Sequence, residues 1–148
     1  MTTVENAQST FASALDKDRL VASLLRPLQQ TLFTNSLRFS PRRTSEVAQE
    51  MADSFLQFRE TENERAVILY GQNLARDGMS PHTILSMAEA LRTLCLQSSS
   101  PTTTLVSVAG RYANALLEGY IAAREAFVLQ QQDHIRRAFE RAFERTRS

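Results

Sequence analysis

The residues that could carry out chemistry are few and scattered. The chain has only two histidines, His82 and His134, which lie far apart in the sequence, and neither belongs to a metal-binding spacing such as HExxH. A metal or haem site needs ligands that the fold brings together. We therefore expect both histidines to lie exposed on separate helices, and we expect no metal ion.

Acid–base catalysis is the next possibility, because Glu46/Glu50 and Glu60/Glu64 are spaced to share helical faces. Paired carboxylates can act as general acid and base where burial separates their pKa values. Arginines surround both pairs here, at positions 42, 43, 59 and 65. This arrangement indicates a solvated charged surface.

The candidate for nucleophilic catalysis is Cys95, the only cysteine. It lies between two leucines near a predicted helix end, with no base nearby in sequence, so we expect a small buried side chain. The glycines of GQNLARDG (71–78) do not follow a strand and cannot form a P-loop. The sequence therefore predicts no enzymatic activity.

The segment LARDGMSPHTILSMAEAL (74–91) has the order of a helix-turn-helix motif: a helix, a turn at a glycine, and a second helix. Its second helix, however, offers no basic residue before Arg92 for contact with phosphates or base edges. The chain as a whole carries 17 basic and 16 acidic side chains, a net charge of +1, without the excess that nucleic-acid binding needs. We expect a hairpin of the bundle and no nucleic-acid partner.

The composition predicts that helices position these residues. Of the 148 residues 43% are hydrophobic, with 18 Leu and 18 Ala against 7 Val and 4 Ile, and with four Gly and four Pro. Good helix formers thus dominate, which predicts an all-α fold. A single cysteine excludes an internal disulfide. No signal peptide and no apolar run of ~18 residues is visible, so we expect a cytoplasmic protein without a membrane segment.

Local signals place the first helices and their buried faces. We expect a polar, frayed or weakly helical N-terminus over 1–14, then a helix from Asp16 that Pro27 kinks or divides. Ser40-Pro41 predicts the start of the next helix. The spacing predicts that these two helices bury Leu20, Leu24, Leu28, Leu32, Val47, Met51, Phe55 and Phe58.

Three further signals predict the middle of the chain. Thr61 to Glu64 fits a capping box that opens a helix closed by Gly78 in a left-handed conformation. Ser80-Pro81 opens the following helix, and Ser98 to Pro101 reads as a loop. That helix is expected to bury Ile84, Leu85, Met87, Ala88, Leu91 and Leu94.

The last segment, from about Thr102, reads as one long helix with an apolar line. At ~1.5 Å per residue, 40 residues span ~60 Å, more than a small domain is wide, so its end must protrude or find a partner. Gly110 and Gly119 are expected where another helix packs closely, because each costs a helix ~1 kcal/mol relative to Ala. The line comprises Leu105, Val108, Tyr112, Leu116, Tyr120, Phe127, Ile135, Phe139 and Phe143.

These patterns divide the chain into a helical bundle over 15–129 and a C-terminal connector or dimerisation helix over 130–148. A parallel pair of such helices is the simplest way to bury the apolar residues of the tail, although spacing by four also suits packing on the chain's own bundle. Gln130 to Gln132 is either a junction between the two parts or a solvated stretch. The residues expected to face the partner are Leu116, Tyr120, Phe127, Ile135, Phe139 and Phe143.

Two stretches resemble a known family. LYGQNLARDGMSPHTILSMAEALRTLC (69–95) is similar to the middle of the N-terminal sensory domains of RsbR-type stressosome proteins and related bacterial signalling proteins. LLEGYIAAREAFVLQQQDHIRRAFERAFE (116–144) resembles their long closing helix. The matching features are the Gly78 turn, the segment 116–120 and the stretch 136–138, within a likeness that covers roughly residues 40–145.

The resemblance implies a globin-like helical domain that dimerises, usually without haem, and passes a signal along its last helix. In that family the helix leads into a STAS, kinase or similar output domain. This sequence stops at Ser148, so we expect either a fragment of a longer protein or a stand-alone protein. The alternative hypothesis is a haem- or small-ligand-binding globin-like sensor, with a pocket among Phe55, Phe58, Leu74, Met87 and Tyr112.

Overall fold

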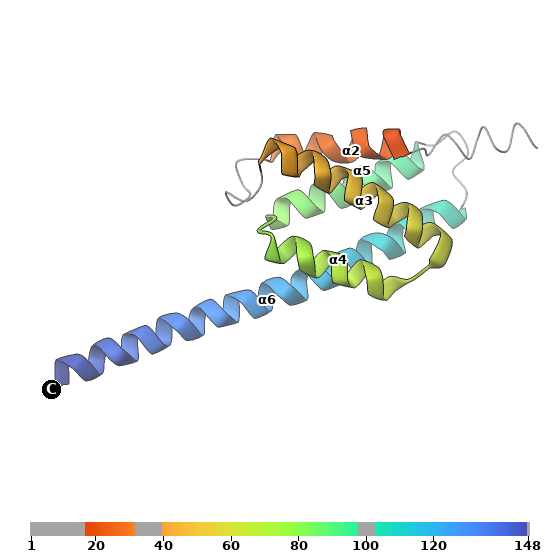
Figure 1. Cartoon of the computed structure of the whole chain (residues 1–148). Coiled ribbons are helices and arrows are strands. Elements are labelled where there is room, and N and C mark those ends of the chain that lie inside the picture. Colours follow the sequence, from red (N-terminus) through yellow and green to blue (C-terminus); the bar gives the residue numbers. More distant parts are fainter. Residues whose placement is uncertain (1–16, 32–39, 98–102, 148) are drawn as a thin grey trace, which may run out of the picture.

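The computed structural model describes residues 17–31, 40–97 and 103–147. In these ranges every regular element is a helix, which confirms the all-α prediction and the single long final helix (Figure 1). The predictions for residues 1–14, for the burial of Leu32 and for the loop at Ser98 to Pro101 lie outside the described residues. The elements are α2 (Lys17–Gln30), α3 (Pro41–Thr61), α4 (Glu64–Arg76), α5 (Pro81–Leu96) and α6 (Thr103–Arg147).

Two helices begin at the serine–proline pairs that predicted them. The Ser40 hydroxyl accepts from the Arg43 amide at 3.2 Å, and the Ser80 hydroxyl accepts from the Thr83 amide at 3.2 Å. Each serine thus satisfies an amide that the first helical turn leaves free, while the proline lacks the N–H that would need a partner. Gly78, with φ 92°, takes the left-handed conformation predicted after α4.

The start of α4 and the course of α2 differ from the prediction. Asn63 caps α4 by accepting from the Ala66 amide at 3.4 Å, so the capping box at Thr61 is wrong. Thr61 instead ends α3, where its hydroxyl donates to the Gln57 carbonyl at 2.9 Å. The helix α2 continues as one element across the buried Pro27, which leaves the two-helix alternative without support.

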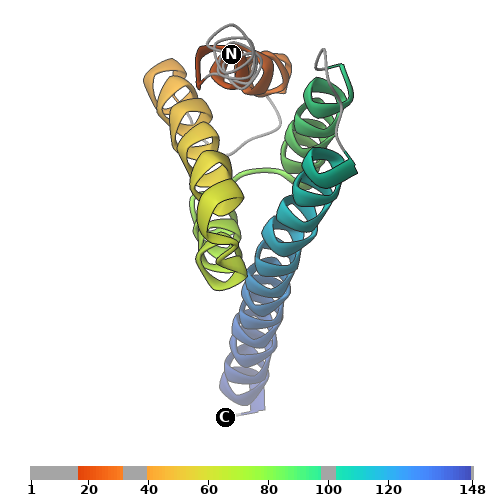
Figure 2. The same cartoon turned by 90° about the vertical axis from the view of Figure 1, so that its right-hand side faces the viewer.

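The helices pack around one core. In Figure 2, α2 lies across one end of the molecule, with α3 on one side and α5 on the other. α5 lies between α2 and α6, and α4 runs beside α6 in the same direction (Figure 1). The predicted buried faces of α2, α3 and α5 are confirmed for the described residues except Leu85, which is 54% exposed. The largest fully buried side chains are Tyr112, Tyr120, Phe55 and Phe58.

Two glycines bring α4 and α6 into backbone contact. A Cβ on Gly71 would overlap the Leu116 carbonyl oxygen, and one on Gly119 would overlap that of Ile68. The close approach predicted at Gly119 is therefore confirmed. The one predicted at Gly110 is wrong, because a Cβ there would meet no atom within 4 Å. The pair Gly71 and Gly119 fixes the direction in which α6 leaves the bundle.

A buried row of hydroxyls joins α2 to the start of α5. The Thr83 hydroxyl donates to the Thr31 hydroxyl at 2.7 Å, and Thr31 donates in turn to the Pro27 carbonyl at 2.7 Å. The Ser80 hydroxyl lies 2.8 Å from that of Thr83. The row satisfies polar groups that would otherwise be buried without partners, and it ties the two helix ends together.

Candidate interaction surface on the C-terminal helix

The helix α6 consists of a buried half and a projecting half. Its last buried side chain is Tyr120, whose hydroxyl donates to the Met79 carbonyl just before α5. Beyond Tyr120 no side chain of α6 up to Arg147 is buried, and Figure 1 shows this part extending away from the other helices. At ~1.5 Å per residue this projection is ~40 Å long. It begins earlier than the boundary predicted at residue 129.

The projecting half carries a stripe of exposed apolar side chains. Ile121, Val128, Ile135 and Phe139 are 41–73% exposed. At about 100° per residue these four fall within about 40° of one another around the helix axis, with Phe143 at the edge of the same side. Several large apolar side chains exposed on one side of a helix mark a surface that is suited to bind a partner.

The stripe does not continue the side of α6 that packs on the core. Tyr112, Leu116 and Tyr120 face the bundle, and the centre of that buried side lies about 140° around the axis from the stripe. A second molecule on the stripe would therefore contact a side of α6 other than the one that packs on the core. The buried and the exposed apolar residues are two separate surfaces of one helix.

Ion pairs within the helix occupy another side of the projection. Asp133 pairs with Arg136 at 3.1 Å and with Arg137 at 3.3 Å, and Arg136 also approaches Glu140 at 3.9 Å. Pairs at these spacings stabilise an isolated helix by a few tenths of a kcal/mol each. Asp133, Arg137 and Glu140 lie outside the stripe, so this part of the projecting half is amphipathic.

The six residues predicted to face a partner thus divide into groups. Leu116 and Tyr120 are 1% and 2% exposed and belong to the chain's own core, so their assignment to a partner surface is wrong. Ile135, Phe139 and Phe143 are exposed on or beside the stripe. Phe127 is 58% exposed but lies about 120° around the helix from Phe139, outside the stripe.

Sequence reasoning missed two members of the stripe, Ile121 and Val128. Both could have been found from the seven-residue spacing that joins them to Ile135, since this is the repeat of a helix paired with another helix. Steps of four residues drift around the axis by about 40° each. The long apolar line therefore joined residues that do not share a face.

The residues considered for chemistry lie apart from this surface. His82 and His134 are both exposed, as predicted. Among the described residues no three His, Cys, Asp or Glu side chains come close enough together to hold a metal ion. Cys95 is fully buried, as predicted, and burial raises the pKa of its thiol.

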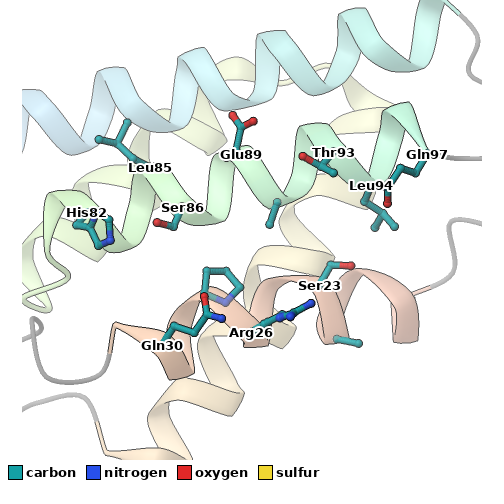
Figure 3. Close-up of a pocket in the computed structure, with 13 residues that line it drawn as sticks. Ser23, Arg26, Gln30, His82, Leu85, Ser86, Glu89, Thr93, Leu94 and Gln97 are labelled. Atoms are coloured by element: carbon teal, nitrogen blue, oxygen red, sulfur yellow. The ribbon is translucent and has the colours of Figure 1, made fainter.

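A surface hollow of about 770 Å³ lies between α2 and α5. His82 and Ser86 of α5 lie opposite Gln30 and Arg26 of α2 across it (Figure 3). Leu85 lines the hollow, which explains why it is exposed although the prediction placed it in the core. The lining combines single charges with small polar groups and presents no catalytic arrangement.

The residues of the predicted haem or ligand pocket form the packed core. The ring centroids of Phe55 and Phe58 lie 5.3 Å and 5.8 Å from that of Tyr112, and all three side chains are at most 2% exposed. Leu74 and Met87 belong to the same buried cluster. These five side chains fill the space in which the alternative hypothesis placed a ligand.

Comparison with known proteins leaves the family open. No family model, curated protein or solved structure matches the chain. None of the described helices combines the length and the apolar character that a membrane crossing requires.

Proposed function

We propose that this chain is a non-catalytic sensor or interaction domain of bacterial stress-response signalling. In this proposal it acts in the cytoplasm as a homodimer and relays a signal through α6 to an output domain or partner protein of the STAS or kinase type. The likeness of residues 40–145 to stressosome sensory domains supports the biological setting. The observation that carries the proposal is the exposed stripe of Ile121, Val128, Ile135 and Phe139 on the projecting half of α6.

A second copy of the same helix would bury this stripe efficiently. Each large apolar side chain moved out of water contributes ~1.5–3 kcal/mol, so four or five per chain give a substantial driving force. In a parallel pair identical positions meet, and the seven-residue spacing of Ile121, Val128 and Ile135 keeps them on one seam. The ion pairs around Asp133 would stay at the solvent-facing side.

The relay follows from the continuity of α6. One helix joins the core residues Tyr112 and Tyr120 to the projecting stripe without a break. A change in how α6 packs on α4 would therefore shift or rotate the projection, provided that the packing has two arrangements of similar energy. Gln130 to Gln132, which are exposed within unbroken helix, remain our candidate junction.

Sedimentation equilibrium of the unmodified chain and of Phe139→Glu tests this proposal. We expect the unmodified chain to dimerise and Phe139→Glu to weaken the dimer by several kcal/mol, because a charge would enter the seam. Phe127→Glu is the matched control, since Phe127 is an exposed phenylalanine of the same helix outside the stripe. A monomer at high micromolar concentration, or equal dimerisation of the unmodified chain and the Phe139→Glu variant, would contradict the proposal.

A further inference from the structure

A second hollow lies at the base of the projecting half, where α6 leaves the bundle beside the start of α5 (Figure 1). This base hollow measures about 550 Å³, and Pro81 is its lining residue from α5. Ile121 and Val128 of the stripe line it, together with the charged residues Arg124 and Glu125. The stripe thus begins at a hollow that combines apolar surface with one charge of each sign.

The two charges of the base hollow have no ion-pair partner among the described residues. Both side chains are exposed, and the positions three and four residues away on α6 hold no group of opposite charge. The Arg124 guanidinium makes a long hydrogen bond to the Tyr120 hydroxyl at 3.4 Å. Further along α6, by contrast, Asp133 and Arg137 pair with each other within the helix. Arg124 and Glu125 therefore keep their charges available for a partner.

Arg124 and Glu125 flank the stripe on opposite sides. At about 100° per residue Arg124 lies about 45° to one side of the centre of the stripe, and Glu125 lies about 55° to the other side. As neighbours in sequence they differ in height by only ~1.5 Å along the helix axis. The base of the stripe therefore has a positive edge and a negative edge at almost the same height.

A parallel pair of α6 helices brings these opposite edges together. A two-fold axis parallel to the helices places Arg124 of one chain beside Glu125 of the partner subunit, and the same contact recurs on the far side of the seam. The pair thus gains two ion pairs related by symmetry. In an antiparallel pair like edges meet, and neither residue faces its counterpart.

The charges also distinguish the correct register from a slipped one. Because three apolar residues of the stripe are spaced by seven, a slip by seven residues keeps apolar side chains opposite one another. For one of the two chains, the same slip places Arg124 and Glu125 opposite Gln132 and Gln131, which carry no charge. Pairing in register is therefore the arrangement that satisfies the charges of both chains.

We propose that Arg124 and Glu125 select a second copy of this chain, in parallel orientation and in register, through reciprocal ion pairs at the base of the α6 dimer. These ion pairs presuppose the dimer proposed above, and the two residues set its orientation and register. A surface that carries both members of its own ion pairs is complementary to itself. A partner with one sign of charge would leave one of the two residues unpaired.

Charge reversal tests this assignment by sedimentation equilibrium of the full chain at low ionic strength, where exposed charges interact most strongly. Arg124→Glu and Glu125→Arg should each weaken the homodimer by about tenfold, because two attractive pairs become repulsive. An equimolar mixture of the two variants should dimerise as tightly as the unmodified chain, because one variant brings only negative charge and the other only positive charge. The double variant Arg124→Glu/Glu125→Arg should also regain the dimer.

Arg141→Glu is the matched control, because Arg141 is an exposed arginine of the projecting half on the side of the helix away from the stripe. This variant should dimerise as the unmodified chain does. The assignment is overturned if either single reversal leaves the dimer unchanged, or if the mixture associates no more tightly than the two variants alone. A dimer that Phe139→Glu weakens and both reversals leave intact would refute these ion pairs alone, whereas a monomeric unmodified chain would refute the α6 dimer as well.

Discussion

Gly119 of α6 lies directly against the backbone of Ile68 in α4, with no room for a methyl group between the two residues. One turn earlier on α6, the Leu116 carbonyl meets Gly71 in the same way. The two helices thus interlock through one glycine on each. This contact holds the buried half of α6 on the bundle and sets the course of its projecting half.

The first prediction concerns this contact. Gly119→Ala should destabilise the fold by ~2 kcal/mol or more, because the methyl group forces the α4 and α6 backbones apart. Chemical denaturation at matched protein concentration measures the change. Gly110→Ala is the control in the same helix. Since Gly110 faces open space, alanine should raise the free energy of unfolding by up to ~1 kcal/mol. Equal effects of the two substitutions would show that the backbones do not meet at Gly119.

The second prediction compares two buried tyrosines of α6. Tyr120→Phe removes the donor to the Met79 carbonyl and should cost ~1–3 kcal/mol, because that carbonyl loses its buried partner. Tyr112→Phe removes a hydroxyl that has Ser54 beside it but no hydrogen bond of good geometry among the described residues, and it keeps the ring contacts with Phe55 and Phe58. The substitution should leave the free energy of unfolding unchanged or raise it slightly. Thermal and urea unfolding distinguish the two, and a larger loss at Tyr112 than at Tyr120 would contradict the assignment.

The third prediction concerns alkaline pH. Burial, the largest cause, raises the pKa of Tyr70 and Tyr112 above the ordinary value of 10. Above pH 10 the unfolded chain therefore releases these protons while the folded chain keeps them. The free energy of unfolding should then fall as pH rises, by up to ~1.4 kcal/mol per pH unit for each tyrosine.

Urea unfolding from about pH 9 to pH 11.5 measures this slope. Tyr112→Phe serves as the check, because it should reduce the slope by the contribution of one tyrosine. Tyrosinate absorbance should rise together with unfolding. Ionisation of all three tyrosines near pH 10 in the folded chain would show that Tyr70 and Tyr112 are not buried as described.

Much of the fold could be predicted because its signals are local. The pairs Ser40-Pro41 and Ser80-Pro81 and the turn at Gly78 act within one helical turn, and the structure has helix ends at each of them. The Leu and Phe spacings of α2 and α3 predicted their buried faces for the same reason. The prediction at Thr61 was wrong because a threonine hydroxyl can either cap the helix that follows or donate to a carbonyl of the preceding turn. Here it donates to the Gln57 carbonyl.

The candidate interaction surface was harder to predict, because it depends on which helices meet. Gly110 and Gly119 cannot be distinguished in the sequence. Only the packing of α4 on α6 shows that the backbones meet at Gly119 and not at Gly110. The apolar line through Leu116, Tyr120 and Phe139 likewise looks continuous, although the first two residues are buried in the core. Where α6 leaves the bundle is set by tertiary contacts, which spacing alone does not report.

Disulfide cross-linking at Gln132 tests most directly whether two α6 helices meet in parallel along the stripe. At about 100° per residue Gln132 lies between Phe139 and Phe143 around the helix axis, on the stripe side, whereas Gln130 lies opposite. The buried Cys95 can stay in place, because burial keeps its thiol protonated and covered. Under mild oxidation Gln132→Cys should form a covalent dimer and Gln130→Cys should not. Failure of Gln132→Cys to cross-link, or equal cross-linking at both positions, would contradict the parallel α6 dimer and the relay that depends on it.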